Sequence, residues 1–192
     1  QKEVLEEMIP ALKERRKPFL LHGVTGSGKT EVYIRLVKEA VKMGKGAIIL
    51  VPEIVLTPQM ISWFKSRFGD DMAVLHSRLS AGERFDEWRR IRFGKARIVI
   101  GARSAVFAPM ENLGVIIVDE EHEQSYQSMS FPQYDARDIA LSRCKREKAV
   151  CVLASATPSI YSYAMARRGD YTLLEMPHRI LNRPLPEIQV VD

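Results

Sequence analysis

The sequence contains few cysteines and no long apolar run. Its two cysteines, Cys144 and Cys151, have no histidine at the spacing of a metal site, so we expect them to behave as small hydrophobic residues. No apolar stretch approaches the roughly 20 residues of a membrane-spanning helix, and no secretory leader is recognisable. Internal repeats and low-complexity tracts are also missing. These absences argue against a disulfide-rich or membrane-spanning protein, and they predict a cytoplasmic setting without a membrane partner.

The composition is that of an ordinary globular domain. Apolar residues make up 46% and charged residues 28% of the 192 residues, enough for one well-formed core. The formal net charge of +5 mildly favours a polyanionic partner, although many basic proteins bind no nucleic acid.

A glycine-rich turn near the amino end carries the clearest chemical signal. An apolar run at 19–21 enters the turn Gly23–Thr30, which reads GVTGSGKT, and a segment with helical spacing leaves it. Gly26 and Gly28 lack a Cβ, which lets successive backbone N–H groups turn inward around a polyphosphate. The next helix points its positive end at the same anion, Lys29 reaches the terminal phosphates, and the Thr30 hydroxyl can ligate Mg²⁺. The predicted nucleotide-binding residues here are Gly23, Thr25, Gly26, Ser27, Gly28, Lys29 and Thr30.

Apolar runs alternate with segments of helical spacing along the chain. We expect buried strands at 19–21, 47–51, 73–75, 97–100, 115–118, 150–153 and 171–175. Helices are expected between them, and Ser80 with Glu83 forms the capping-box signature of one. The stretch 123–134 has no clear periodicity. The alternation predicts an α/β fold with a central, mostly parallel sheet and helices on both faces.

Polar motifs follow several predicted strands, at the sheet edge where such folds bind ligands. They lie at 23–30, 52–59, 101–104, 119–122 and 155–157. Asp119 follows four apolar strand residues, which is the setting of a Mg²⁺-holding aspartate in P-loop enzymes. Glu120 beside it would orient and deprotonate an attacking water. Acidic residues also begin many ordinary loops, but their position after a P-loop favours one shared site.

Together these motifs resemble the first motor lobe of the primosomal replication-restart DNA helicases. The matching segments are GVTGSGKTEVY, LVPEIVLTPQ, HSRLSAGER, IGARSAVFAP, IIVDEEHEQSY, SATPS and NRPLPEIQVVD. That family consists of DEAH-type helicases with paired RecA-like lobes, and the resemblance covers essentially the whole chain. It implies a three-layer RecA-like P-loop NTPase lobe over residues 1–176. Residues 177–192 would be a linker toward a second motor lobe.

The resemblance also implies roles for individual residues. Lys29, Asp119 and Glu120 would form the catalytic set around ATP, with Glu120 as the base. Thr30 and Asp119 would hold Mg²⁺. Gln1 falls where the family has an adenine-reading glutamine. The residues that couple hydrolysis to movement between lobes would be His122, Ser155 and Thr157.

Contacts with DNA are implied for two backbone-binding motifs and one aromatic loop. The residues are Thr57, Gln59, Arg103, Ser104, Tyr126, Phe131 and Tyr134. Hydroxyl, amide and guanidinium groups suit phosphates, and aromatic rings stack on bases without reading sequence. The loop departs from the family pattern at Gln133 and Asp135, where an arginine and a histidine are expected. Alternatively, Arg103 forms a loop-packing salt bridge, and Phe131 and Tyr134 pack onto the lobe.

By this resemblance, the parent protein would use ATP to translocate 3′-to-5′ on single-stranded DNA and unwind duplex at stalled forks for replication restart. Its partners would be single-stranded and forked DNA, the second lobe of the same parent chain, and other primosome or single-strand-binding proteins. One lobe alone should hydrolyse ATP weakly, because the arginine finger comes from outside the P-loop lobe. Two alternatives stay open: another DEAH-type translocase acting in branch migration, repair or restriction, or a nucleotide-binding switch without motor activity.

Overall fold

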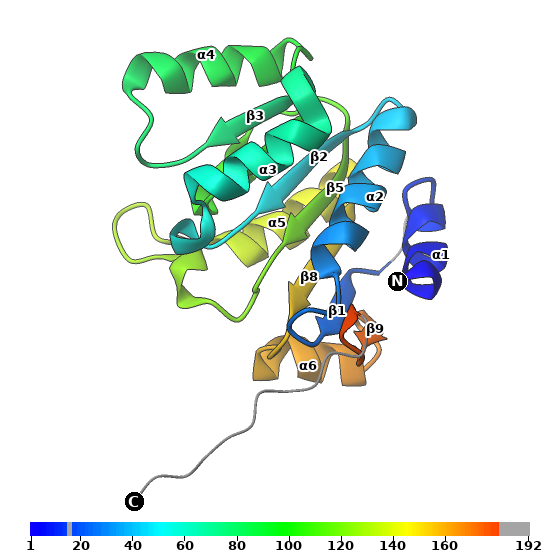
Figure 1. The fold of residues 1–192 in the computed structure, drawn as a ribbon. Coiled ribbons are helices and arrows are strands. Elements are labelled where there is room, and N and C mark those ends of the chain that lie inside the picture. The colour runs from blue at the N-terminus through cyan, green and yellow to red at the C-terminus, as the bar shows by residue number, and fades with distance from the viewer. Residues whose placement is uncertain (15–16, 181–192) are drawn as a thin grey trace, which may run out of the picture.

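Seven parallel strands form the central sheet of the computed structural model, which describes residues 1–14 and 17–180 (Figure 1). Their order across the sheet is β3-β4-β2-β5-β8-β1-β9, and each neighbouring pair is parallel. A separate two-stranded antiparallel ribbon consists of β6 and β7. The predicted α/β fold is confirmed.

The strands of the main sheet are β1 (Phe19–Gly23), β2 (Gly46–Leu50), β3 (Met72–Leu75), β4 (Ile98–Gly101), β5 (Leu113–Val118), β8 (Val150–Ser155) and β9 (Thr172–Met176), and those of the ribbon are β6 (Gln127–Ser128) and β7 (Tyr134–Asp135). The helices are α1 (Lys2–Ala11), α2 (Lys29–Lys42), α3 (Pro58–Phe68), α4 (Ala81–Arg92), α5 (Ala136–Glu147) and α6 (Ile160–Arg167). None of the described helices has the length and apolarity needed to cross a membrane.

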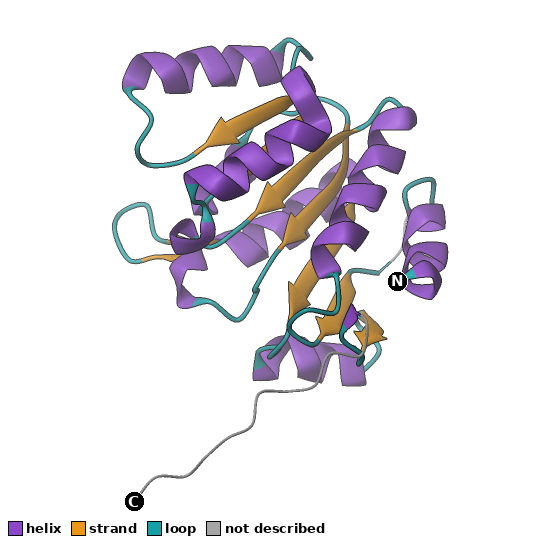
Figure 2. Cartoon of the chain, viewed as in Figure 1, coloured by secondary structure: helices purple, strands orange, loops and turns teal. Residues whose placement is uncertain are grey.

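Helices cover both faces of the sheet, which gives the lobe three layers (Figure 2). Along β1, Phe19 and Leu21 enter the core shared with α1, α2 and α3, whereas Leu20 enters the opposite core. That second core takes Ile91 from α4 and Ala140 from α5. The alternation follows from the two-residue repeat of side-chain direction in a strand, so continuous apolar runs suit strands buried on both faces.

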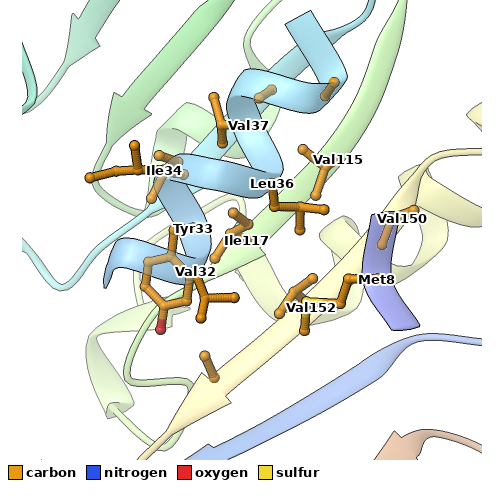
Figure 3. Close-up of a cluster of buried hydrophobic side chains, with 14 of the residues drawn as sticks. Met8, Val32, Tyr33, Ile34, Leu36, Val37, Val115, Ile117, Val150 and Val152 are labelled. Atoms are coloured by element: carbon orange, nitrogen blue, oxygen red, sulfur yellow. The ribbon is translucent and has the colours of Figure 1, made fainter. Parts of the chain in front are cut away.

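The helix that follows the glycine-rich turn, α2, packs on the sheet through a cluster of buried apolar side chains (Figure 3). Leu36 and Val37 of α2 are fully buried and pack with Ile117 of β5 and Val152 of β8. Met8 of α1 closes the same cluster from the side. Burial of each large apolar side chain contributes about 1.5–3 kcal/mol. This packing holds the start of α2 at a fixed position against the carboxyl ends of the strands.

Local capping signals determine where several helices begin. Ser80 accepts a hydrogen bond from the Glu83 backbone N–H while the Glu83 carboxylate accepts one from the Ser80 N–H, so the predicted capping box is confirmed. Thr57 caps α3 and Ser159 caps α6 through their hydroxyl oxygens.

One feature was not expected from the sequence, and one expectation lies mostly outside the described residues. The ribbon β6–β7 falls within residues 127–135, a region without clear periodicity in the sequence. Each of its strands has two residues, which is too short to produce a periodic pattern. The linker expected at 177–192 is described only as far as Ile180, and residues 181–192 lie outside the described part of the chain.

Candidate functional site

Parallel pairing brings the polar motifs together at one edge of the sheet. His22 at the end of β1 is in register with Ser155 at the end of β8. Val118 at the end of β5 is in register with Leu50 of β2 and Leu153 of β8. The glycine-rich turn, the 119–122 segment and the 155–157 segment therefore leave neighbouring strands side by side.

The glycine-rich turn has the backbone shape that its sequence predicts. Gly26 has φ +80° and Gly28 has φ +88°, both in the left-handed region that glycine adopts without steric cost. The Ser27 N–H donates to the Val24 carbonyl (3.0 Å), which closes the turn, and α2 begins at Lys29 directly after Gly28. The free N–H groups at this helix start supply the positive end of a dipole.

Lys29 and Ser27 point polar atoms into the turn. Lys29 is only 8% exposed; its Nζ donates to the Gly23 carbonyl (2.8 Å) and lies 3.8 Å from Glu120 Oε1. The Ser27 hydroxyl is buried and has no hydrogen-bond partner among the described residues. A buried hydroxyl without a partner is costly, and a bound phosphate oxygen would satisfy it. This turn fits a polyphosphate.

Asp119 is held by a tyrosine that the sequence motifs do not include. Its Oδ1 accepts a hydrogen bond from the Tyr33 hydroxyl (2.7 Å) and another from the Glu120 backbone N–H (3.1 Å). Burial raises the pKa of Asp119, and the hydrogen bond from Tyr33 acts in the opposite direction. Tyr33 lies in the first turns of α2, with its ring in the core and its hydroxyl at the outer end (Figure 3).

Asp119 and the Thr30 hydroxyl are the groups available to a divalent cation. Mg²⁺ is usually bound by one or two carboxylates together with substrate phosphates and waters. One half-buried carboxylate beside a phosphate-binding turn fits that pattern.

Glu120 adopts an uncommon backbone conformation. Its φ is +46°, in the left-handed region that side chains other than glycine rarely occupy. Its carboxylate lies 3.8 Å from Lys29 Nζ and 3.6 Å from His122 Nδ1. The side chain is thus directed into the space between the P-loop lysine and the histidine.

Two of the three predicted coupling residues are in direct contact. His122 Nδ1 and Ser155 Oγ lie 2.8 Å apart, and Ser155 is fully buried. Thr157 joins them through its backbone, because its N–H donates to Ser155 Oγ (2.9 Å). The strand end β8 is therefore linked to the acidic segment after β5.

Glu121 is a structural member of the site that motif reasoning missed. It is 1% exposed, and its carboxylate accepts hydrogen bonds from Ser159 N (2.6 Å), Ser159 Oγ (3.0 Å) and Ser162 Oγ (2.8 Å). Its carbonyl accepts from Arg137 (2.7 Å). Glu121 thus ties the 119–122 segment to the start of α6 and to α5.

Gln1 lies at the P-loop although it is distant in sequence. Its Nε2 donates to the Ser27 carbonyl (3.0 Å). Gln1 therefore lies beside the glycine-rich turn, and its adenine-reading role stays a prediction.

The predicted backbone-binding residues lie on the same edge. Gln59 and Ser104 are exposed, and Thr57 is exposed while it caps α3. Arg103 is half-buried and donates to the carbonyls of Ser125 (3.4 Å) and Gln127. Arg103 therefore packs onto this loop through main-chain carbonyls, and among the described residues the salt bridge of the alternative interpretation is not found.

The aromatic loop divides into buried and exposed rings. Tyr126 is fully buried and its hydroxyl donates to the carbonyls of Leu50 (3.1 Å) and Asp119 (2.5 Å). Its ring has no face open to a base, so its assignment to DNA stacking is corrected: it braces the main chain at Asp119. Phe131 is 97% exposed and free to stack.

Tyr134 takes an intermediate position. Its ring packs edge-to-face on Phe107 (5.0 Å between centroids), and the Arg103 guanidinium lies 5.7 Å from its centroid. This matches the alternative in which Tyr134 packs onto the lobe, and its half-buried ring keeps some exposed surface.

The two departures from the family pattern have local partners. Asp135 caps α5 and forms two hydrogen bonds with the Arg137 guanidinium (2.9 and 2.5 Å). Burial raises the pKa of Asp135, but the bonds from Arg137 outweigh it and leave the pKa lowered. Gln133 Nε2 donates to the Met129 carbonyl (3.3 Å). Asp135 is therefore fixed within the lobe.

Comparison with protein families and curated proteins identifies related chains. The family model for the DEAD/DEAH box helicases matches residues 2–165. The replication restart protein PriA of Bacillus subtilis (strain 168) is 54% identical over 179 residues, which are 93% of this chain and 22% of that protein. PriA of Synechocystis is 45% identical over 197 residues, covering 100% of this chain and 24% of that protein. The chain thus spans about a quarter of the length of these curated relatives.

Solved structures share the fold at lower identity. RecG bound to a three-way DNA junction has a TM-score of 0.67 at 22% identity, covering 92% of this chain and 23% of that one. The Hef helicase domain of Pyrococcus furiosus has a TM-score of 0.63 at 18% identity, covering 91% and 37%. These likenesses identify the lobe as a RecA-like helicase fold.

Proposed function

The chain belongs to the DEAD/DEAH box helicase family, and we propose that it is the ATP-binding motor lobe of a replication-restart DNA helicase. One observation carries the proposal: Lys29 Nζ lies between the Gly23 carbonyl of the phosphate-binding turn and the Glu120 carboxylate, with Asp119 adjacent. That arrangement places an anion-binding turn and two carboxylates within one site, as in-line phosphoryl transfer requires.

Each residue has a distinct part in hydrolysis. The inward N–H groups of the turn and Lys29 bind the phosphates of ATP, and the Ser27 hydroxyl finds its partner there. Thr30 and Asp119 would hold Mg²⁺, which supplies neutralisation of the phosphate charge. Glu120 orients the attacking water and accepts its proton. The pair His122–Ser155 links this chemistry to β8 and, in the parent protein, to the second lobe.

The parent protein's activity follows from the same proposal. It would translocate on single-stranded DNA, with 3′-to-5′ polarity, and unwind duplex at stalled forks in the cytoplasm. The relatives' identity of 45–54% over almost the whole chain supports replication restart over branch migration, repair or restriction. Forked DNA, the second lobe, and primosome or single-strand-binding proteins are the proposed partners. Thr57, Gln59, Ser104 and Phe131 are the exposed residues among the proposed DNA contacts.

ATP turnover with and without single-stranded DNA tests the proposal. We expect the isolated chain to bind Mg²⁺–ATP and hydrolyse it slowly, since an arginine finger from outside the lobe contributes about 10³–10⁵ in rate. In the parent protein, DNA should raise turnover, and Glu120→Gln should abolish it while nucleotide binding persists. Lys29→Ala should abolish binding, whereas Lys38→Ala on the exposed side of α2 is the matched control. If single-stranded DNA leaves the ATP turnover of the parent protein unchanged, the alternative of a nucleotide-binding switch without motor activity is favoured.

A further inference from the structure

The two ends of the described chain meet on the outer side of the P-loop. Gln1 precedes α1, whereas Arg179 and Ile180 follow β9, and all three lie against the turn at 26–28. The resemblance anticipated Gln1 there, but it gave the segment after β9 only the role of a linker toward a second motor lobe.

The contacts of this segment with the turn are specific. The Ile180 N–H donates to the Gly26 carbonyl (3.0 Å), and the Val24 N–H of the turn donates to the Met176 carbonyl at the end of β9 (3.2 Å). A Cβ placed on Gly28 would lie 2.9 Å from Ile180 Cδ1 and 2.0 Å from Gln1 Nε2, so both side chains approach the same glycine. A Cβ on Gly26 would lie 3.9 Å from Arg179 Cγ.

We propose that Arg179 and Ile180, together with Gln1, form the nucleoside-binding wall of the ATP site. The proposal rests on the proposed nucleotide-binding function. The inward N–H groups of the turn are occupied by phosphates, so the ribose and base must leave the turn past its rim. The rim consists of Gly26, Ser27 and Gly28, of which the glycines offer no side chain. The wall must therefore come from residues packed against them.

The three side chains have complementary chemistry for a nucleoside. Ile180 is 50% exposed and offers an apolar surface to one face of a planar base. The Arg179 guanidinium is planar and cationic, which suits stacking on a base. The Gln1 amide already donates to Ser27 and keeps its carbonyl oxygen and a second N–H for the base edge. Because Arg179 and Ile180 come only three and four residues after the end of β9, base binding would also hold this short segment against the P-loop.

Calorimetric titration with two ligands separates this wall from the phosphate site. The 192-residue chain is titrated with ADP and, separately, with inorganic tripolyphosphate, both with Mg²⁺. Arg179→Ala and Ile180→Ala should each weaken ADP binding about three- to tenfold, the range of one stacking contact. Tripolyphosphate binding should stay unchanged in both variants. His178→Ala, in the same exposed segment, is the control and should leave both ligands unaffected.

Each of the other possible results contradicts a specific part of the proposal. Unchanged ADP affinity in both variants refutes the wall, and tighter ADP binding shows that the segment obstructs the site. Equal losses for ADP and tripolyphosphate show a contribution to the phosphate site only. If the wild-type chain binds neither ligand, the proposed nucleotide function itself fails. Melting temperatures should match the wild type, since both side chains lie beyond β9.

Discussion

Tyr33→Phe tests how the Asp119 carboxylate is prepared for metal binding. The variant removes one hydroxyl that donates to Asp119 Oδ1 at 2.7 Å and leaves the buried ring in place. A hydrogen bond to a charged group contributes about 1.5–3 kcal/mol. Because a domain of this size changes its melting temperature by about 2–4 °C per kcal/mol, we expect a loss of roughly 3–12 °C.

The more specific expectation concerns pH. Burial raises the pKa of Asp119 and the Tyr33 bond lowers it, so the variant raises that pKa further. A raised carboxyl pKa means that the folded state binds the proton more tightly than the unfolded state. The contribution of Asp119 to stability therefore falls as pH rises from the unfolded-state pKa through the folded-state pKa. Mg²⁺ needs the ionised carboxylate. The Mg²⁺-dependent part of nucleotide affinity should therefore increase with pH, and in Tyr33→Phe that increase should occur at higher pH.

Tyr126→Phe is the matched control. Its hydroxyl is also buried but donates to the main-chain carbonyls of Leu50 and Asp119, not to the carboxylate. It should lower the melting temperature without displacing the pH curve. The test is nucleotide affinity measured across pH with and without Mg²⁺. If the Mg²⁺-dependent affinity of Tyr33→Phe and that of the wild type depend on pH in the same way, the positioning role of Tyr33 is refuted.

Three further expectations follow from contacts in the lobe. Glu121→Ala leaves the start of α6 without its buried acceptor and should cost about 2–4 kcal/mol of unfolding free energy in chemical denaturation. Phe131→Ala should leave the melting temperature unchanged, because the ring is 97% exposed, but reduce DNA-stimulated ATPase in the parent protein; equal stimulation would count against stacking. Gly101→Ala places a Cβ 2.3 Å from the Leu75 carbonyl of the neighbouring strand and should destabilise the lobe by about 1–3 kcal/mol in the same denaturation assay.

Local chemistry made much of the fold predictable from sequence. Gly26 and Gly28 were expected at positions that need a left-handed backbone, and both have positive φ. The capping pair Ser80 and Glu83 marked a helix start correctly because its hydrogen bonds lie within four residues. Parallel pairing and a shared edge followed from strand and helix alternation alone.

Features that depend on distant contacts were not predictable. Tyr33 meets Asp119 across 86 positions of sequence, and nothing in the local pattern of α2 distinguishes a core tyrosine from one that holds a carboxylate. Tyr126 and Phe131 belong to one aromatic stretch, yet one is fully buried and the other almost fully exposed. Composition gives the same signal for both rings, and only the tertiary structure separates them.

The place of β1 in the sheet determines when the nucleotide site can exist during synthesis. Although β1 precedes the other described strands in the sequence, both of its neighbours, β8 and β9, come from the last quarter of the described chain. Strands β3, β4, β2 and β5 pair among themselves and are complete at Val118, so this half can assemble while the chain is still leaving the ribosome. The Val24 N–H of the P-loop donates to the Met176 carbonyl at the end of β9. The P-loop can therefore take its final shape only after the long-range pairing of β1 with β8 and β9, and it is among the last parts to form. A nascent chain that stops before β9 would carry the complete GVTGSGKT sequence without the sheet that shapes it.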